Sequence, residues 1–299
     1  MKLFKHNKIA ILFFVVAWVL TLERLCAAEQ AVQQQLEGFN LSGYTDSGDK
    51  AWDINGDTAD ISDQNIKITN VNANSYGKQN ANLTAKTGNI NKVTGDIQLN
   101  KDVVTTSNDR GTQLLTESLE WKRNEDLVST NDPVKIKDKD MTITGTGITA
   151  HPNLKTAAIN EDVTANVKTV TATGSGTGSS LTSASGQTVL ITCDGPLELD
   201  QFRQSAVFNK NVVAIEKSTG RELRADKVEV YFDQKNSKIK RLLCTGNVSI
   251  KQGNNMTFAD QLNYDALDQK MTLTGRPRLI MDVGDSQNNP FKGLDKKKE

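Results

Sequence analysis

From about residue 36 onward, apolar and polar residues alternate with a period of two, and Gly, Asn or Asp interrupts this alternation every eight to twelve residues. Val228, Val230 and Phe232 are one example, and Met271 and Leu273 are another. Such alternation places the apolar side chains on one face of a strand. Almost no stretch shows the 3.6-residue period of a helix. The pattern therefore predicts an all-β body of short, largely antiparallel strands joined by turns.

The strand pattern occurs twice along the chain. Residues 100–121 align without gaps on residues 209–230, with identical residues at seven of 22 positions. After a five-residue adjustment, the alignment continues from 132–159 onto 246–273. The shared order of strands and turns over so long a stretch indicates two copies of one module.

The segment between the copies has a different composition. Residues 168–187 are rich in Gly, Ser and Thr, which is typical of a flexible linker. The sequence thus predicts a first module at 36–167 and a second module at 188–283. The last segment, 284–299, contains a proline and a lysine run and is predicted to be a disordered tail.

The N-terminus has the three parts of a secretory signal. Lysines precede an apolar run at 9–22, and Cys26, Ala27 and Ala28 form a small-residue site after it. As a helix the run would rise about 21 Å, which is short of a hydrocarbon core about 30 Å thick. We expect residues 1–28 to be a cleaved signal peptide, and an uncleaved membrane anchor is the alternative. Either way the remainder is exported, and we expect a bacterial periplasm.

Export leaves open a disulfide bond between Cys193 and Cys244, because thiols oxidise in that compartment. The two cysteines fall at matching points of the local strand pattern. A bond would require their Cα atoms to lie within about 7 Å.

Composition argues against several kinds of function. The 299 residues contain 36 Lys and Arg against 36 Asp and Glu, so there is no basic excess to attract nucleic acid. Only two histidines are present, and neither has a second His or a Cys at metal-ligand spacing. No Ser-His-acid set can be assembled without His151. We therefore expect no catalytic residues, no metal site, no cofactor and no enzymatic activity.

Several short motifs resemble the periplasmic bridge proteins of lipopolysaccharide transport. Residues 38–60, GFNLSGYTDSGDKAWDINGDTAD, are similar to the entry strands of LptC. The second half resembles LptA, also called the OstA-like family, at 221–231 (RELRADKVEVY), 244–250 (CTGNVSI) and 273–277 (LTGRP). Finding both modules on one chain departs from the separate LptC and LptA proteins, and it leaves open whether this chain replaces both.

The resemblance implies a fold and partners. It implies two tandem, twisted, boat-shaped β-jellyrolls whose sheets enclose an apolar groove for the lipid A acyl chains of lipopolysaccharide. It also implies an inner-membrane ABC transporter complex as a partner. Pairing of edge strands would join the chain to other bridge or outer-membrane Lpt components, and residues 279–283 are the expected C-terminal edge.

Alternation in the second module identifies candidate groove residues, although it does not distinguish a groove lining from a dry core. The candidates are Ala206, Phe208, Val228, Val230, Phe232, Val248, Ile250, Met256, Phe258, Leu262, Met271 and Leu273.

Two other classes of protein fit parts of the pattern. A β-solenoid surface or structural protein is also rich in Thr, Asn and Gly, but it would show shorter and more regular rungs. A polysaccharide-acting β-helix enzyme would need clustered carboxylates, whereas the acidic residues here are scattered along the sequence.

Overall fold

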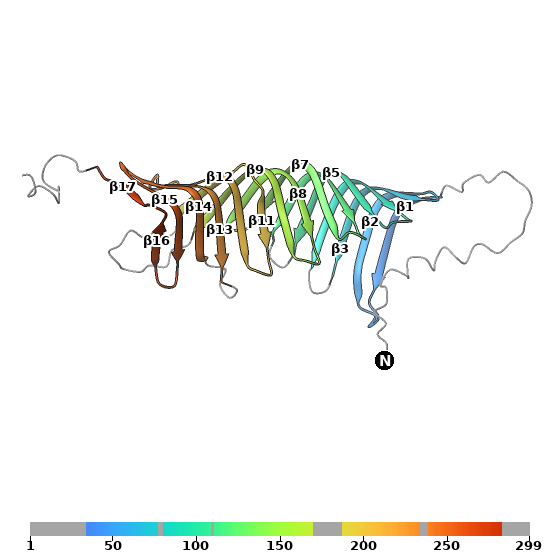
Figure 1. Cartoon of the computed structure of the whole chain (residues 1–299). Coiled ribbons are helices and arrows are strands. Elements are labelled where there is room, and N and C mark those ends of the chain that lie inside the picture. The colour runs from blue at the N-terminus through green and yellow to red at the C-terminus, as the bar shows by residue number, and fades with distance from the viewer. Residues whose placement is uncertain (1–33, 77–79, 109–110, 170–186, 234–238, 283–299) are drawn as a thin grey trace, which may run out of the picture.

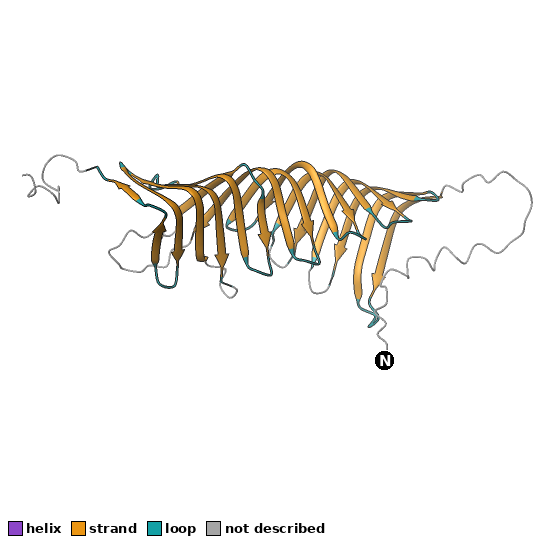
Figure 2. Cartoon of the chain, in the orientation of Figure 1, coloured by secondary structure: helices purple, strands orange, loops and turns teal. Residues whose placement is uncertain are grey.

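The structure, a computed structural model, describes residues 34–76, 80–108, 111–169, 187–233 and 239–282. The described part is all-β, and Figure 2 shows strands joined by turns. No helix among these residues has the length and apolar character needed to cross a bilayer. The predicted signal segment and C-terminal tail lie outside the described residues.

The strands are numbered in chain order, as in Figure 1. They are β1 (Gln34–Tyr44), β2 (Lys50–Ile61), β3 (Asn65–Ser75), β4 (Ala81–Asn91), β5 (Ile97–Ser107), β6 (Gln113–Lys122), β7 (Leu127–Lys137), β8 (Met141–His151), β9 (Thr156–Thr169), β10 (Gln187–Cys193), β11 (Leu197–Asp200), β12 (Ser205–Glu216), β13 (Glu222–Phe232), β14 (Ile239–Gln252), β15 (Asn255–Asp265), β16 (Lys270–Thr274) and β17 (Arg278–Ile280).

All pairings are antiparallel, and most strands pair with their neighbours in the sequence. β10 and β11 both lie between β9 and β12, and β16 and β17 both pair with β15. The sheet therefore runs in chain order from β1 at one end to β16 and β17 at the other, and Figure 1 shows this as a colour gradient along an elongated, twisted body. The prediction of an antiparallel, all-β jellyroll is confirmed.

Most strands bend near their middle, and the bend has a visible cause. Register shifts occur between Asn100 and Val103 in β5, and between Asn209 and Val212 in β12. Residues at these shifts, including Lys101 and Lys210, have positive φ. A β-bulge bends a strand and increases its twist. Each bent strand therefore contributes to both layers of the body (Figures 1 and 2).

The two halves of the chain are hydrogen-bonded into one sheet. The long strand β9 pairs with β10 through its C-terminal part and with β11 through its N-terminal part, and β12 pairs with both in turn. β10 and β11 thus form one broken strand, interrupted at Gly195 and Pro196. Most of the predicted linker lies outside the described residues, and the domain boundaries stay a prediction.

The internal repeat has a structural counterpart. Leu119 on β6 and Val228 on β13 align in sequence, and both are buried on the inner face. The same holds for Val134 on β7 and Val248 on β14. The aligned stretches therefore form equivalent strands of the two halves.

Candidate functional site

Two rows of side chains run along the inner face of the sheet, one on each side of the bend. Directly paired residues in an antiparallel sheet share a face, so each row can be followed from strand to strand. We call these the central rows. One contains Ala59, Ile68, Gly88, Leu99, Leu119, Thr130, Ile148, Ile159, Leu197, Phe208, Val228, Cys244, Leu262 and Leu273. The other contains Val71, Ala85, Val103, Thr116, Val134, Gly145, Val163, Cys193, Val212, Ala225, Val248 and Ala259.

Two further rows lie farther from the bend on the same face, and we call them the flanking rows. The first contains Ile66, Ile90, Ile97, Trp121, Val128, Ala150, Ala157, Leu199, Ala206, Val230, Leu242, Tyr264 and Met271. The second contains Ile54, Ala73, Leu83, Thr105, Leu114, Ile136, Ile143, Ala165, Ile191, Ala214, Leu223, Ile250, Thr257 and Leu279.

Burial decreases from the central to the flanking rows. Ile159 and Leu197 in a central row are each 0% exposed. Most large apolar side chains of the flanking rows, such as Leu114 and Leu242, are only partly buried against this core. The inner face is therefore sealed at the bend and keeps accessible apolar surface farther out. An acyl chain could be covered by such a surface.

The structure brings most of the predicted lining residues together. Phe208, Val228, Leu262 and Leu273 lie in one central row, and Val248 lies in the other. The remaining inner-face candidates, Ala206, Val230, Met271 and Ile250, lie in the flanking rows, and Phe232 packs against the core next to Val230.

Met256 and Phe258 lie on the opposite face from the other candidates. Phe258 pairs with Ser249, whose neighbours Val248 and Ile250 both point inward. The outer position of Phe258 also brings its ring under the Arg278 guanidinium, with 4.7 Å from Cζ to the ring centroid. Between the pairs Thr245–Gln261 and Val248–Ala259, β14 has two residues and β15 has one. The buried residues Ala259 and Leu262 of β15 are therefore three positions apart, and the alternation shifts there. Contrary to the prediction, these two side chains therefore do not face the inner surface.

Cys193 and Cys244 are both buried free cysteines. They lie on β10 and β14, three pairing steps apart through β12 and β13. At about 4.8 Å per step, the two strands lie about 14 Å apart along the sheet, which is too far for a disulfide bond. The bond that the sequence left open is not formed in this structure. Burial raises the pKa of the Cys244 thiol to about 12 and also raises the pKa of Cys193.

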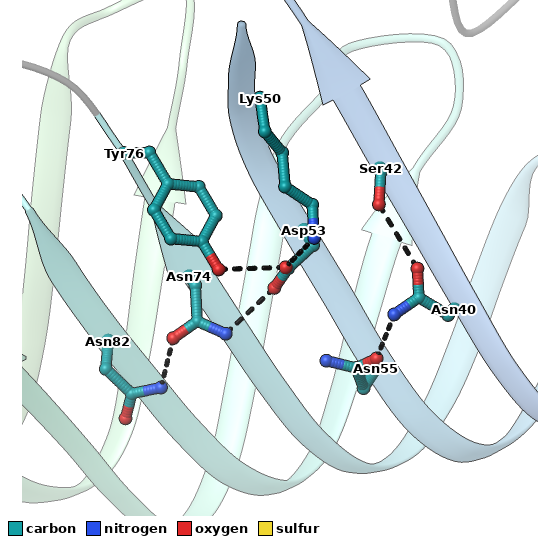
Figure 3. Close-up of polar contacts among 8 residues, drawn as sticks. All are labelled: Asn40, Ser42, Lys50, Asp53, Asn55, Asn74, Tyr76 and Asn82. Carbon is teal, nitrogen blue, oxygen red and sulfur yellow. Dashed lines mark hydrogen bonds and ion pairs between the residues drawn. The ribbon is translucent and has the colours of Figure 1, made fainter.

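The N-terminal edge of the sheet is held by a polar network on the outer face (Figure 3). Asp53 on β2 accepts hydrogen bonds from Lys50 Nζ at 2.5 Å, Asn74 Nδ2 at 2.8 Å and the Tyr76 hydroxyl at 2.9 Å. Asn82 on β4 donates to Asn74 at 2.8 Å, which extends the network across three strands.

The same network sets the charge state of Asp53. The hydrogen bond from Lys50, followed by those from Asn74 and Tyr76, lowers the pKa of this carboxyl from 3.8 to about 2, although burial acts in the opposite direction. The carboxylate is therefore charged throughout the neutral range.

Both ends of the described sheet present strand edges with apolar side chains. On β1, which pairs only with β2 among the described strands, Leu36 is 45% and Leu41 is 40% exposed. At the other end, Leu279 is 59% and Ile280 is 47% exposed on β17. Unpaired edges of this kind can accept a further strand.

Side chains that could bind a metal ion are dispersed over the described residues. His151 Nδ1 lies 3.1 Å from the backbone carbonyl oxygen of Asp126. Within the described ranges, no group of three or more His, Cys, Asp or Glu side chains is placed to hold a metal ion.

Sequence reasoning did not name lining residues in the first half, although the signal was available. The repeat alignment places Trp121 opposite Val230 and Leu119 opposite Val228. The structure puts all four side chains on the inner face.

Comparison with protein families gives two matches in sequence. Residues 9–168 match the family model described as lipopolysaccharide-assembly, LptC-related. Residues 191–293 match the model described as LptA/(LptD N-terminal domain) LPS transport protein. A search of curated proteins gives no match.

Proposed function

Because the chain belongs to the family of LptC-related lipopolysaccharide-assembly proteins, with an LptA-like module after the LptC-like one, we propose that it is a lipid-carrying component of the lipopolysaccharide transport bridge. It would work without catalysis. The acyl chains of lipopolysaccharide would lie against the flanking rows. One chain would supply the parts that LptC and LptA otherwise supply separately.

The observation that carries this proposal is the continuity of the flanking rows across β9, β11 and β12, the joint between the two halves. Ala157 of β9 pairs with Leu199 of β11, which pairs with Ala206 of β12, so the first row passes from one half to the other without interruption. Covering one methylene group contributes about 0.8 kcal/mol. About a dozen of them outweigh a surface ion pair, which contributes about 0 to 1 kcal/mol.

The edges suggest how the chain would be connected. We propose that β1 faces the inner-membrane components and that β16 and β17 pair with a further bridge or outer-membrane component by strand addition. An apolar surface by itself has no preferred direction. We therefore propose that an ABC transporter in the inner membrane supplies the energy. The location would be the periplasm, with residues 1–28 as an export signal or anchor.

Two pairs of adjacent leucines allow a matched crosslinking test. Leu114 and Leu242 lie on the inner face, whereas Leu115 and Leu243 lie on the outer face, and all four are partly exposed. A photoreactive residue would be placed at each position in turn in cells. We expect lipopolysaccharide adducts at 114 and 242 and few at 115 and 243.

Equal labelling within each pair would contradict the inner-face assignment. Depletion of the protein provides an independent test, because a bridge component is required for export. We expect lipopolysaccharide to accumulate at the inner membrane, and normal delivery to the outer membrane would contradict the proposed role.

A further inference from the structure

Trp121 is the most exposed large side chain in the first flanking row. It pairs with Ile97 on β5 and with Val128 on β7, both of which are partly buried against the core. The indole itself is 39% exposed. The indole thus leaves a large aromatic surface open on the inner face, whereas Tyr264 in the same row is packed against the core. A ring in this position can cover an apolar chain without any movement of the backbone.

A cation lies directly over this ring. The guanidinium carbon of Arg123 is 5.4 Å from the centroid of the Trp121 ring. Among the described residues, the Arg123 side chain takes part in no ion pair. The Asp96 carboxylate accepts hydrogen bonds from the Arg123 backbone N–H at 3.2 Å and from the Thr94 hydroxyl at 2.8 Å. The guanidinium donors are therefore available to a ligand.

The second half of the chain shows that the fold does not require this pair. In the repeat alignment, Trp121 corresponds to Val230, and continuing the same register two residues further places Arg123 opposite Phe232. Val230 is only 6% exposed, and Phe232 packs against the core. At equivalent positions, one half thus carries an exposed aromatic ring with a cation, and the other half carries a closed apolar contact. This difference points to a ligand with both an apolar chain and a negative charge.

We propose that Trp121 and Arg123 form a subsite for the phosphate-bearing end of an acylated lipid. The indole covers the first methylene groups of a chain, and the guanidinium binds the phosphate by charge-assisted hydrogen bonds. This inference rests on the proposed function and assigns the phosphate to the transported lipopolysaccharide. It places recognition of the charged headgroup in the first half of the chain.

The test compares two amphiphiles with the same twelve-carbon chain, dodecyl phosphate and uncharged dodecyl maltoside. The full chain would be kept soluble with a nonionic, phosphate-free amphipol. Binding of radiolabelled amphiphile below its critical micelle concentration would be measured by equilibrium dialysis, with the amphipol alone as the blank. We expect the unmodified chain to prefer dodecyl phosphate by about tenfold, the order expected for one hydrogen bond to a charged group. Arg123→Gln should abolish the preference, because the affinity for dodecyl phosphate should fall to that for dodecyl maltoside. Arg123→Lys should retain part of it.

Lys122 provides a matched control, because it is the adjacent residue and alternation directs its side chain to the outer face. Lys122→Gln should keep the phosphate preference. Trp121→Val, which copies the second half, should weaken binding of both amphiphiles several-fold. Urea unfolding of each variant checks that the fold is intact.

Competition experiments separate the sources of the phosphate. Lipid A should displace dodecyl phosphate more effectively than a phosphatidylglycerol of matched chain length, and the reverse order would overturn the assignment to lipopolysaccharide. Equal affinity for both amphiphiles in the unmodified chain would overturn the subsite while leaving the proposed function intact. Absence of binding by either amphiphile would overturn both.

Discussion

The first half of the chain buries the hydroxyl groups of Thr116 and Thr130 in its central rows, whereas the aligned positions of the second half hold Ala225 and Cys244. Both halves nevertheless have the same bent strands and the same two-layer arrangement. The backbone arrangement therefore depends on strand pairing and β-bulges, and it tolerates different side chains in the core. The second half is the more apolar of the two at these positions.

The flanking rows also differ between the halves, and again the second half is the more apolar. Trp121 with Arg123 in the first half stands opposite Val230 with Phe232 in the second. Under the proposed function, the lipid would enter at the first half of the chain, and its charged headgroup would meet Arg123 there. The comparison suggests that the first half contributes headgroup recognition and that the second contributes mainly apolar cover.

Removing packed side chains where the two halves join should have the largest effect on the free energy of unfolding. Ile159 and Leu197 pair directly, and each is fully buried. Replacing either by Ala should lower the free energy of unfolding by about 2 to 5 kcal/mol. Since one sheet joins the halves, we expect a single urea transition that shifts as a whole. Leu154→Ala, at a side chain that is 66% exposed, is the control and should change stability by less than about 0.5 kcal/mol. A shift confined to one of two transitions would show that the halves unfold separately.

Exchanging polarity between the halves should have a smaller effect. Thr116 Oγ1 is buried and has no hydrogen-bond partner among the described residues. Thr116→Val should therefore raise the free energy of unfolding by about 1 kcal/mol. The reciprocal change, Ala225→Thr, adds volume and a hydroxyl group to the more apolar half. It should lower the free energy of unfolding by about 1 to 3 kcal/mol. Urea titration measures both. Destabilisation by Thr116→Val would mean that the hydroxyl has a partner.

The Asp53 network belongs to the first half only, and its contribution should depend on pH. The folded pKa of about 2 lies below the ordinary 3.8, so its stabilisation is complete above the ordinary value and is lost as pH falls toward 2. Asp53→Asn should therefore lower the urea midpoint at pH 6 and have progressively less effect toward pH 2. Glu37→Gln, on the exposed edge strand, controls for loss of a carboxylate. A decrease in the urea midpoint of Asp53→Asn that does not vary with pH would contradict this explanation.

The smallest effect is expected at the cysteines of the second half. Burial raises the pKa of both thiols, to about 12 for Cys244, and thiolate is the reactive form. Neither Cys193 nor Cys244 should react with iodoacetamide in the native chain, and both should react in urea. Mass spectrometry of the separated peptides distinguishes them. A Cys193–Cys244 linked peptide from the native chain would contradict the separation of about 14 Å estimated from the strand spacing.

Much of the fold could be predicted from local pattern. Alternation identified the strands, and the repeat alignment placed Leu119 and Val228 in equivalent positions that the structure confirms. The assignment of the inner face was less secure at Met256 and Phe258. Their own alternation is regular, but a bulge in the paired strand β14 shifts the register of β15, so that they occupy the outer face.

The sequence by itself determined the strand period, the doubled module and the resemblance to lipopolysaccharide-transport proteins, because these depend on residues close together in the chain or on their order. Only the tertiary structure decided that one sheet passes through both halves, that the central rows are sealed while the flanking rows are partly open, and that Arg123 lies over Trp121. The physical reason is that bulges change the facing of every later side chain in a strand, and pairing between strands then determines which faces are covered.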